Sequence, residues 1–233
     1  MGDFDLYRAR MNVDGSDMSS SYLNETSNFL NQTFADSPSF TQIQVEGVVT
    51  DARIIRNPEN PHAKRVLFRP NTVVYEGQYV TYNNDTWLIQ HFQPHPVFPK
   101  GDILQCNESL RWIDAAGVSH IVPCVFISLH RMVTVTQDTQ METFKFQMRV
   151  LVKYTDETQS IQVSQRFILG NQAYIVAGID SVSEIYDGHG TLDISIETTD
   201  WLSSDDKVNG IADNSRLWTQ NTGVQNGGGS SLW

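Results

Sequence analysis

The residues that could do chemistry are few and scattered along the chain. His91 and His95 stand four residues apart, but neighbouring prolines exclude the helix that would direct both imidazoles at one metal ion. The segment Asp187-Gly188-His189-Gly190 sets an acid beside a histidine, yet a glycine-flanked Asp is typical of a hairpin turn. Asp205 and Asp206 are typical of a solvated pair of carboxylates. None of these sets predicts a catalytic site, so we expect no enzyme activity, no cofactor and no metal.

Sequence motifs of catalysis and phosphate binding are also missing. There is no phosphate loop, no GxSxG, no HExxH and no CxxC. Cys106 and Cys124 flank a predicted hairpin turn at residues 114–117, so they could be neighbours. We expect both as buried or half-buried thiols, because a zinc site built with His120 would need a fourth ligand that no spacing supplies.

The charge balance limits the possible partners. Sixteen Lys and Arg against 27 Asp and Glu give a net charge of −11, which argues against a surface that binds nucleic acid phosphates. An acidic surface can still line a passage through which DNA slides. No apolar run approaches the roughly 18 residues that span a bilayer, and the first ten residues lack the apolar core of a signal peptide. We therefore expect a protein made in the cytoplasm, without membrane contact.

A strand-rich stretch, Tyr79–Trp112, has a weaker echo in Phe167–Trp201. In each, a short polar turn of Asn, Asp or Gly separates two apolar runs, as hairpins require. The aligned pairs are Trp87 with Tyr174, Ile89 with Val176, Phe92 with Ile179, and Trp112 with Trp201. One β-module used twice is the hypothesis, and a chance likeness of two strand-rich segments is the alternative.

The fold class expected from this pattern is mainly β. It consists of two tandem small antiparallel β-barrels or sandwiches, preceded by an N-terminal α-helical segment. The expected domains are 1–40, an N-terminal helical segment; 41–130, the first β-barrel module; 131–202, the second β-barrel module; and 203–233, an extended C-terminal arm.

Four segments are candidates for contact with partners. The amphipathic helix expected from Met18 to Phe34 either packs on its own domain or docks on a neighbouring subunit. The proline-rich loops at 57–63 and 92–100 are exposed and stiff, although the second could instead fold back over its own barrel. Aromatic residues in the C-terminal arm lose burial unless they dock on a surface. The candidate contact residues are Phe92, Pro94, Pro96, Val97, Phe98, Pro58, Pro61, His62, Tyr22, Phe29, Leu30, Trp218 and Trp233.

Several segments resemble a known family. An N-terminal helix followed by Leu67–Pro70, Gly77–Val80, Thr86–Ile89 and Leu104–Trp112 resembles the head-completion, or stopper, β-barrel proteins in the neck of tailed bacteriophages. The segment Gly170–Val176 repeats the likeness, so the resemblance runs from about Thr41 to Thr199. This barrel type also occurs in tail terminator and tail hub proteins. Stoppers are usually single barrels of about half this length, so a doubled barrel leaves closure, adaptor and tail attachment open.

The resemblance implies a structural role in the virion, after assembly in the host cytoplasm. It implies a homo-oligomeric ring of six or twelve copies between the portal or adaptor and the tail proteins. The packaged DNA would pass through the lumen without specific binding, and no catalytic group would be required. The alternatives are a tail hub or terminator, a receptor-binding or carbohydrate-binding β-protein of the virion, and a hydrolase with an unrecognised site.

Overall fold

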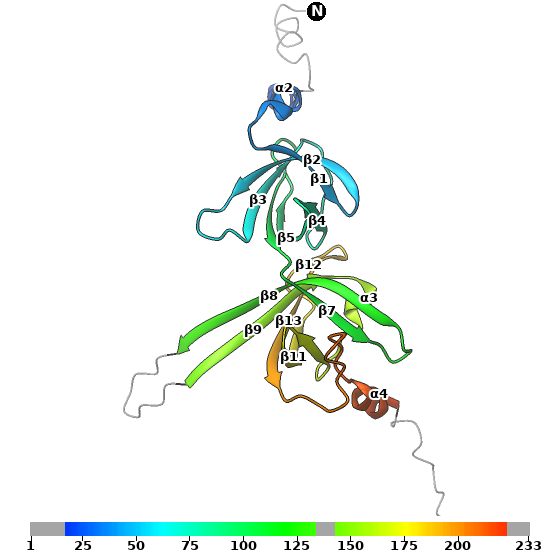
Figure 1. Cartoon of the computed structure of the whole chain (residues 1–233). Coiled ribbons are helices and arrows are strands. Elements are labelled where there is room, and N and C mark those ends of the chain that lie inside the picture. Colours follow the sequence, from blue (N-terminus) through cyan, green and yellow to red (C-terminus); the bar gives the residue numbers. More distant parts are fainter. Residues whose placement is uncertain (1–16, 134–142, 223–233) are drawn as a thin grey trace, which may run out of the picture. The chain divides into compact units, whose positions relative to one another are not determined.

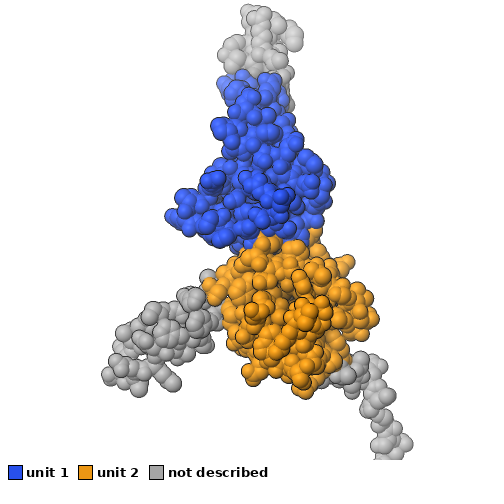
Figure 2. All heavy atoms as spheres, in the orientation of Figure 1, with its two compact units in different colours: residues 1–105 blue, residues 106–233 orange. Residues whose placement is uncertain are grey.

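The chain divides into two compact units. The computed structural model describes residues 17–133 and 143–222, and the units are Met1–Gln105 and Cys106–Trp233, coloured separately in Figure 2. Strands dominate both units and a helix precedes the first, so the predicted fold class is confirmed. No helix in the described ranges has both the length and the apolar character needed to cross a membrane.

Six antiparallel strands close into a barrel in the first unit (Figure 1). A helix, α2 (Met18–Thr33), and a 3-10 turn, η1 (Phe34–Asp36), precede the strands. The order around the barrel is β1-β2-β3-β6-β5-β4, and pairing of β1 with β4 completes it. The strands are β1 (Phe40–Val45), β2 (Val48–Arg56), β3 (Ala63–Phe68), β4 (Tyr79–Tyr82), β5 (Asp85–Gln93) and β6 (Lys100–Gln105).

The barrel core follows from the alternation of apolar and polar residues along each strand. In β1, Ile43 and Val45 are buried while Gln42 and Gln44 are exposed, because successive side chains point to opposite faces. The β4–β5 turn has positive φ angles at both Asn83 and Asn84, which asparagine tolerates, and the predicted hairpin is confirmed. The buried core residues are Ile43, Val45, Ala52, Val66, Phe68, Val74, Val80, Trp87, Ile89 and Ile103.

The second unit is an open antiparallel sheet. Its strand order is β10-β11-β13-β9-β8-β7, with β12 paired to β13. A short helix, α3 (Asp156–Gln159), joins β9 to β10, and α4 (Ser215–Thr222) follows the sheet. The strands are β7 (Glu108–Ile113), β8 (Ser119–Val133), β9 (Thr143–Lys153), β10 (Arg166–Leu169), β11 (Gln172–Asp180), β12 (Ile185–Tyr186) and β13 (His189–Thr199).

The two sheets have the same strand order. If β7, β8, β9, β10, β11 and β13 are matched in turn to β1 through β6, every pairing of the open sheet has its counterpart in the closed barrel. A register shift lies between Ile89 and His91 in β5 and between Val176 and Gly178 in β11, at positions that the sequence alignment pairs. This shared topology supports a module used twice. The pair Trp112 and Trp201 does not fit, because Trp112 lies in β7 whereas Trp201 follows β13.

The boundary between the units lies earlier than the sequence indicated. Strands β7 and β8 extend the sheet of the second unit, so that unit begins at Cys106 instead of after residue 130. The physical reason is pairing: β8 bonds along its length to β7 and then to β9, and these bonds hold it in one sheet. Strand content alone does not reveal which neighbour a strand pairs with.

The C-terminal segment from Trp201 to Asn214 packs on the second unit. In the first barrel, β1 and β4 pair directly, whereas β7 and β10 have no ladder between them. Instead the Asn214 side chain accepts from the Arg166 amide at 2.7 Å and donates to the Arg166 carbonyl at 3.0 Å, as a neighbouring strand would. The prediction of an extended C-terminal arm over residues 203–233 is therefore wrong for residues 203–214.

The β8–β9 hairpin is longer than the sheet that it belongs to. Strand β7 pairs with β8 only up to Cys124, and β13 pairs with β9 only from Met148 onward. Among the described strands, the backbone of 129–133 therefore pairs only with that of 143–147. Figure 1 shows this ribbon leaving the second unit. Two-stranded ribbons have little stability by themselves in water, so this ribbon is a further candidate for partner contact.

Candidate interaction surfaces

Helix α2 exposes most of its apolar side chains. Asp17 caps its first turn through a capping box with Ser20. None of its residues is buried, and the predicted contact residues Tyr22 and Phe29 are 58% and 63% exposed. Leu30 is half-buried. The structure therefore does not support packing of this helix against its own domain along its length.

The helix is nevertheless fixed firmly at its C-terminal end. Phe34, only 1% exposed, lies under the guanidinium groups of Arg53 and Arg69, at 4.6 and 5.4 Å from its ring centre. Arg53 also donates to the carbonyls of Thr33 and Phe34, at 2.8 and 3.0 Å. A cation at this position satisfies terminal carbonyls and the negative end of the helix dipole. The result is a helix held at one end.

The proline-rich loop between β5 and β6 folds partly onto its own barrel. Val97 is 3% exposed, and the amides of Val97 and Phe98 donate to His95 Nδ1 at 3.1 and 3.0 Å. Phe92 is half-buried, and its ring lies 6.0 Å from Phe68. Of the predicted contact residues here, Pro94, Pro96 and Phe98 remain exposed, while Val97 belongs to the interior.

The loop between β2 and β3 is exposed, as predicted. Pro58, Pro61 and His62 all lie on the surface. The side chains of Asn57 and Asn60 accept backbone amides two residues on, both at 3.0 Å, which fixes the loop as two Asx turns. His62 Nδ1 bonds to Gln105 Oε1 at 2.8 Å and ties the loop to β6. This loop is a preformed surface.

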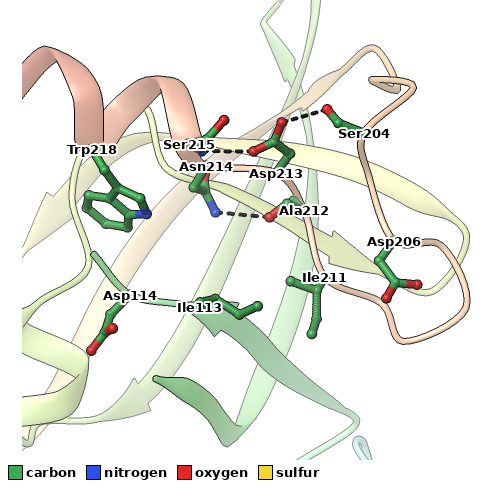
Figure 3. Close-up of a pocket in the computed structure, with 10 residues that line it drawn as sticks. All are labelled: Ile113, Asp114, Ser204, Asp206, Ile211, Ala212, Asp213, Asn214, Ser215 and Trp218. Atoms are coloured by element: carbon green, nitrogen blue, oxygen red, sulfur yellow. Dashed lines mark hydrogen bonds between the residues drawn. The ribbon is translucent and has the colours of Figure 1, made fainter. Parts of the chain in front are cut away.

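The second unit contains a cavity of about 300 Å³ beside α4 (Figure 3). Trp218, a predicted contact residue, is half-buried and lines it. Trp233 lies outside the described residues. The lining residues are Ile113, Asp114, Ser204, Asp206, Ile211, Ala212, Asp213, Asn214, Ser215 and Trp218.

Three carboxylates line this cavity, and each one fixes a turn. A hydrogen bond from His120 lowers the pKa of Asp114, one from Ser204 lowers that of Asp213, and one from Asn209 lowers that of Asp206. Asp114 also accepts the amides of the β7–β8 turn. The three carboxylates are ionised at neutral pH and make the cavity anionic. Their oxygens accept hydrogen bonds from nearby residues of the same unit.

His120 connects three parts of the second unit. Its ring stacks on Trp112 with centroids 4.8 Å apart, Nδ1 lies 2.8 Å from Glu157 Oε1, and Nε2 lies 3.1 Å from Asp114 Oδ2. The hydrogen bond with Asp114, together with that of Glu157, raises the pKa of His120 despite its partial burial. The imidazole thus links the β7–β8 turn to α3 through one hydrogen bond on each ring nitrogen.

This arrangement predicts a stability that depends on pH. A histidine whose pKa is raised by folding stabilises the protein fully below the unfolded value of about 6.5, and this contribution is lost as the pH rises through the folded pKa. We expect the free energy of unfolding from urea titrations between pH 5.5 and 9 to decline over that window, and the decline to be smaller in His120→Gln. Equal pH dependence in both proteins would contradict the prediction.

The other residues whose side chains could take part in catalysis or metal binding have structural roles. Asp187 and Gly188 form the β12–β13 turn with positive φ angles, as predicted. Cys106 and Cys124 are free thiols, and burial raises the pKa of Cys106 to about 12 and that of Cys124 in the same direction. Across residues 17–133 and 143–222, no cluster of three or more His, Cys, Asp or Glu could hold a metal ion.

The comparison with known families concerns the second unit. Its sheet runs from Glu108 to Thr199. Residues 108–197 match the YomX C-terminal domain. The YomX C-terminal domain is a phage-associated family, and the match begins at the first residue of β7 and ends inside β13. The second unit is thus similar to a phage-associated domain, which fits the resemblance to phage proteins. No curated protein and no solved structure matches the chain significantly.

Proposed function

We propose that this chain is a structural protein of the virion of a tailed bacteriophage, forming a ring in the neck between portal and tail. In this role it closes the head, helps to retain packaged DNA and connects the head to the tail. Its partners are copies of itself, a portal or adaptor protein, and tail proteins. It is not an enzyme, and it neither binds a cofactor nor contacts a membrane.

The observation that carries the proposal is the match of the second unit to a phage-associated domain. The repeated strand order adds support, because a module present twice in one chain can offer similar surfaces to two successive neighbours. The net charge of −11 suits a channel wall that DNA passes without binding. The exposed helix α2 and the exposed loop at 57–62 supply surfaces for subunit contacts.

The test is the oligomeric state of the purified full-length chain, alone and with a portal ring from the same phage. We expect a closed ring of six or twelve copies, measured by native mass spectrometry and seen by negative-stain imaging. Labelling of assembled particles with an antibody against the chain should mark the neck. A chain that stays monomeric in both conditions, or a label at the tail tip, would refute the neck assignment.

A further inference from the structure

Helix α2 is anchored at its C-terminal end and uncovered along its length, a combination that needs a physical explanation. Its end is fixed by Phe34 and Arg53, yet Met18, Tyr22 and Phe29 are 49%, 58% and 63% exposed. An isolated helix of this length is marginal in water, and most helices gain stability by burying an apolar face. Such a face, presented on a fixed support, is suited to a surface on another molecule.

The two threonine hydroxyls in the exposed stripe of α2 already have partners within the helix, so the hydroxyl of Tyr22 is the side-chain polar group of the stripe that a partner would have to satisfy. Thr26 donates its hydroxyl to the Tyr22 carbonyl at 2.7 Å, and Thr33 donates to the Phe29 carbonyl at 2.9 Å. Together with Met18, these residues form one stripe along the helix, since they recur at helical spacing. Because both threonine hydroxyls are satisfied inside the helix, the rest of the stripe can be desolvated at little cost.

A complementary surface lies on the β2–β3 hairpin of the same unit. Ile55 is 50% exposed on the outer face of β2, directly across from Arg65. Residues 48–69 carry five Lys or Arg and two acids, although the chain as a whole is acidic. Arg53 and Arg69 contact Phe34 of the same copy and Arg65 pairs with Asp102, so the charge match rests on Arg56, next to Ile55, and on Lys64, across the ladder from Arg56. Residues 17–36 carry Asp17, Glu25 and Asp36 and no Lys or Arg. The helix therefore matches the hairpin in charge as well as in apolar character.

We infer that α2 of one copy docks on the outer face of the β2–β3 hairpin, around Ile55, of a second copy. The two surfaces lie on one unit and differ from each other, so the contact is head-to-tail, and repetition closes a ring when the rotation allows. This inference rests on the proposed function and identifies the lateral contact of the ring.

Charged substitutions on the two surfaces test the inference in the full-length chain. Tyr22→Glu/Phe29→Glu and, separately, Ile55→Glu should weaken self-association by about 100-fold or more, because aromatic and aliphatic anchors are lost and acids are added. Asn24→Glu/Asn28→Glu, on exposed positions of α2 that face away from the stripe, and Val73→Glu in the exposed loop after β3 are matched controls that should assemble normally. All variants should keep the wild-type melting temperature, since none of these side chains is buried.

Mixing the two defective variants gives the sharpest outcome. The intact helix of Ile55→Glu can dock on the intact hairpin of Tyr22→Glu/Phe29→Glu, so the mixture should yield heterodimers that cannot extend, as sedimentation velocity would show. Rings that survive Tyr22→Glu/Phe29→Glu would overturn this inference and leave the neck role standing. A mixture without heterodimers would exclude the hairpin as the docking surface. A wild type that is monomeric with and without the portal would overturn both proposals.

Discussion

Replacement of Asp205 by alanine should lower the free energy of unfolding of the second unit by about 3–5 kcal/mol, because it leaves a buried guanidinium without its partner. The Asp205 side chain is 0% exposed and that of Arg166 is 11% exposed. Two hydrogen bonds join them, Arg166 Nη1 to Oδ1 at 2.7 Å and Nη2 to Oδ2 at 3.0 Å. Asp205 also accepts the amides of Leu202 and Asp213.

Acidification should remove the stabilisation that the Asp205–Arg166 pair contributes. Burial by itself would raise the pKa of Asp205, but the hydrogen bonds from Arg166 and the two backbone amides outweigh it, and the pKa lies below its usual value. For a depressed carboxyl pKa, the stabilisation is present above the unfolded value of about 3.9 and is lost as the pH falls through the folded pKa. Asp205→Asn should therefore lose less stability on acidification than the wild type does.

The neighbouring acid provides the control. Asp206 is exposed and bonds within its own turn to Asn209 and Val208. Asp206→Ala should cost about 1 kcal/mol or less, as expected for a surface turn. Hydrogen exchange measured by mass spectrometry should locate the effect of Asp205→Ala to residues 201–214 and to β10. Equal effects of the two substitutions, or a change confined to the first unit, would contradict the role assigned to Asp205.

Local sequence patterns predicted the strands but not the way in which the second sheet is completed. Alternation and turn residues are local features of a sequence, so the hairpins at 83–84 and 170–171 could be predicted from the sequence. Residues 203–206, Ser-Ser-Asp-Asp, have the composition of a linker, and this interpretation made Asp205 a solvated acid. The structure contradicts it, because Asp205 pairs with Arg166 across many intervening residues. A signal was present: a strand reading Arg-Phe-Ile-Leu buries four residues in a row, and a buried Arg requires an anion.

Contact surfaces were harder to predict than strands. The 57–62 loop could be predicted as exposed, because its prolines lack the amide donors that regular structure requires. Val97, however, could not be assigned to the interior, since the prolines around it permit both an extended loop and one folded back on the barrel. The anchoring of α2 depends on Arg53, which lies in another element and contacts the helix end only in the folded chain. Long-range pairs of this kind leave no periodic trace in one sequence.

Trp112→Ala should destabilise the second unit by about 3–5 kcal/mol, as expected for removing a fully buried indole. Trp112 is 1% exposed, its ring meets that of Phe167 edge to face at 6.0 Å, and it carries the stacked imidazole of His120. Phe167 lies in β10 and Trp112 in β7, the two strands that have no ladder between them. Side-chain packing thus takes the place of backbone pairing at this seam.

The sequence alignment paired Trp112 with Trp201, and this pair is the matched control. Trp201 is half-buried, with the Lys207 ammonium 4.5 Å from its ring centre, so Trp201→Ala should cost only about 1–2 kcal/mol. Urea titrations of both variants, with circular dichroism as the probe, measure the difference. If the two tryptophans were equivalent members of a repeat, the two losses would be equal; if Trp112 closes the seam, its loss alone should also speed hydrogen exchange in β7 and β10.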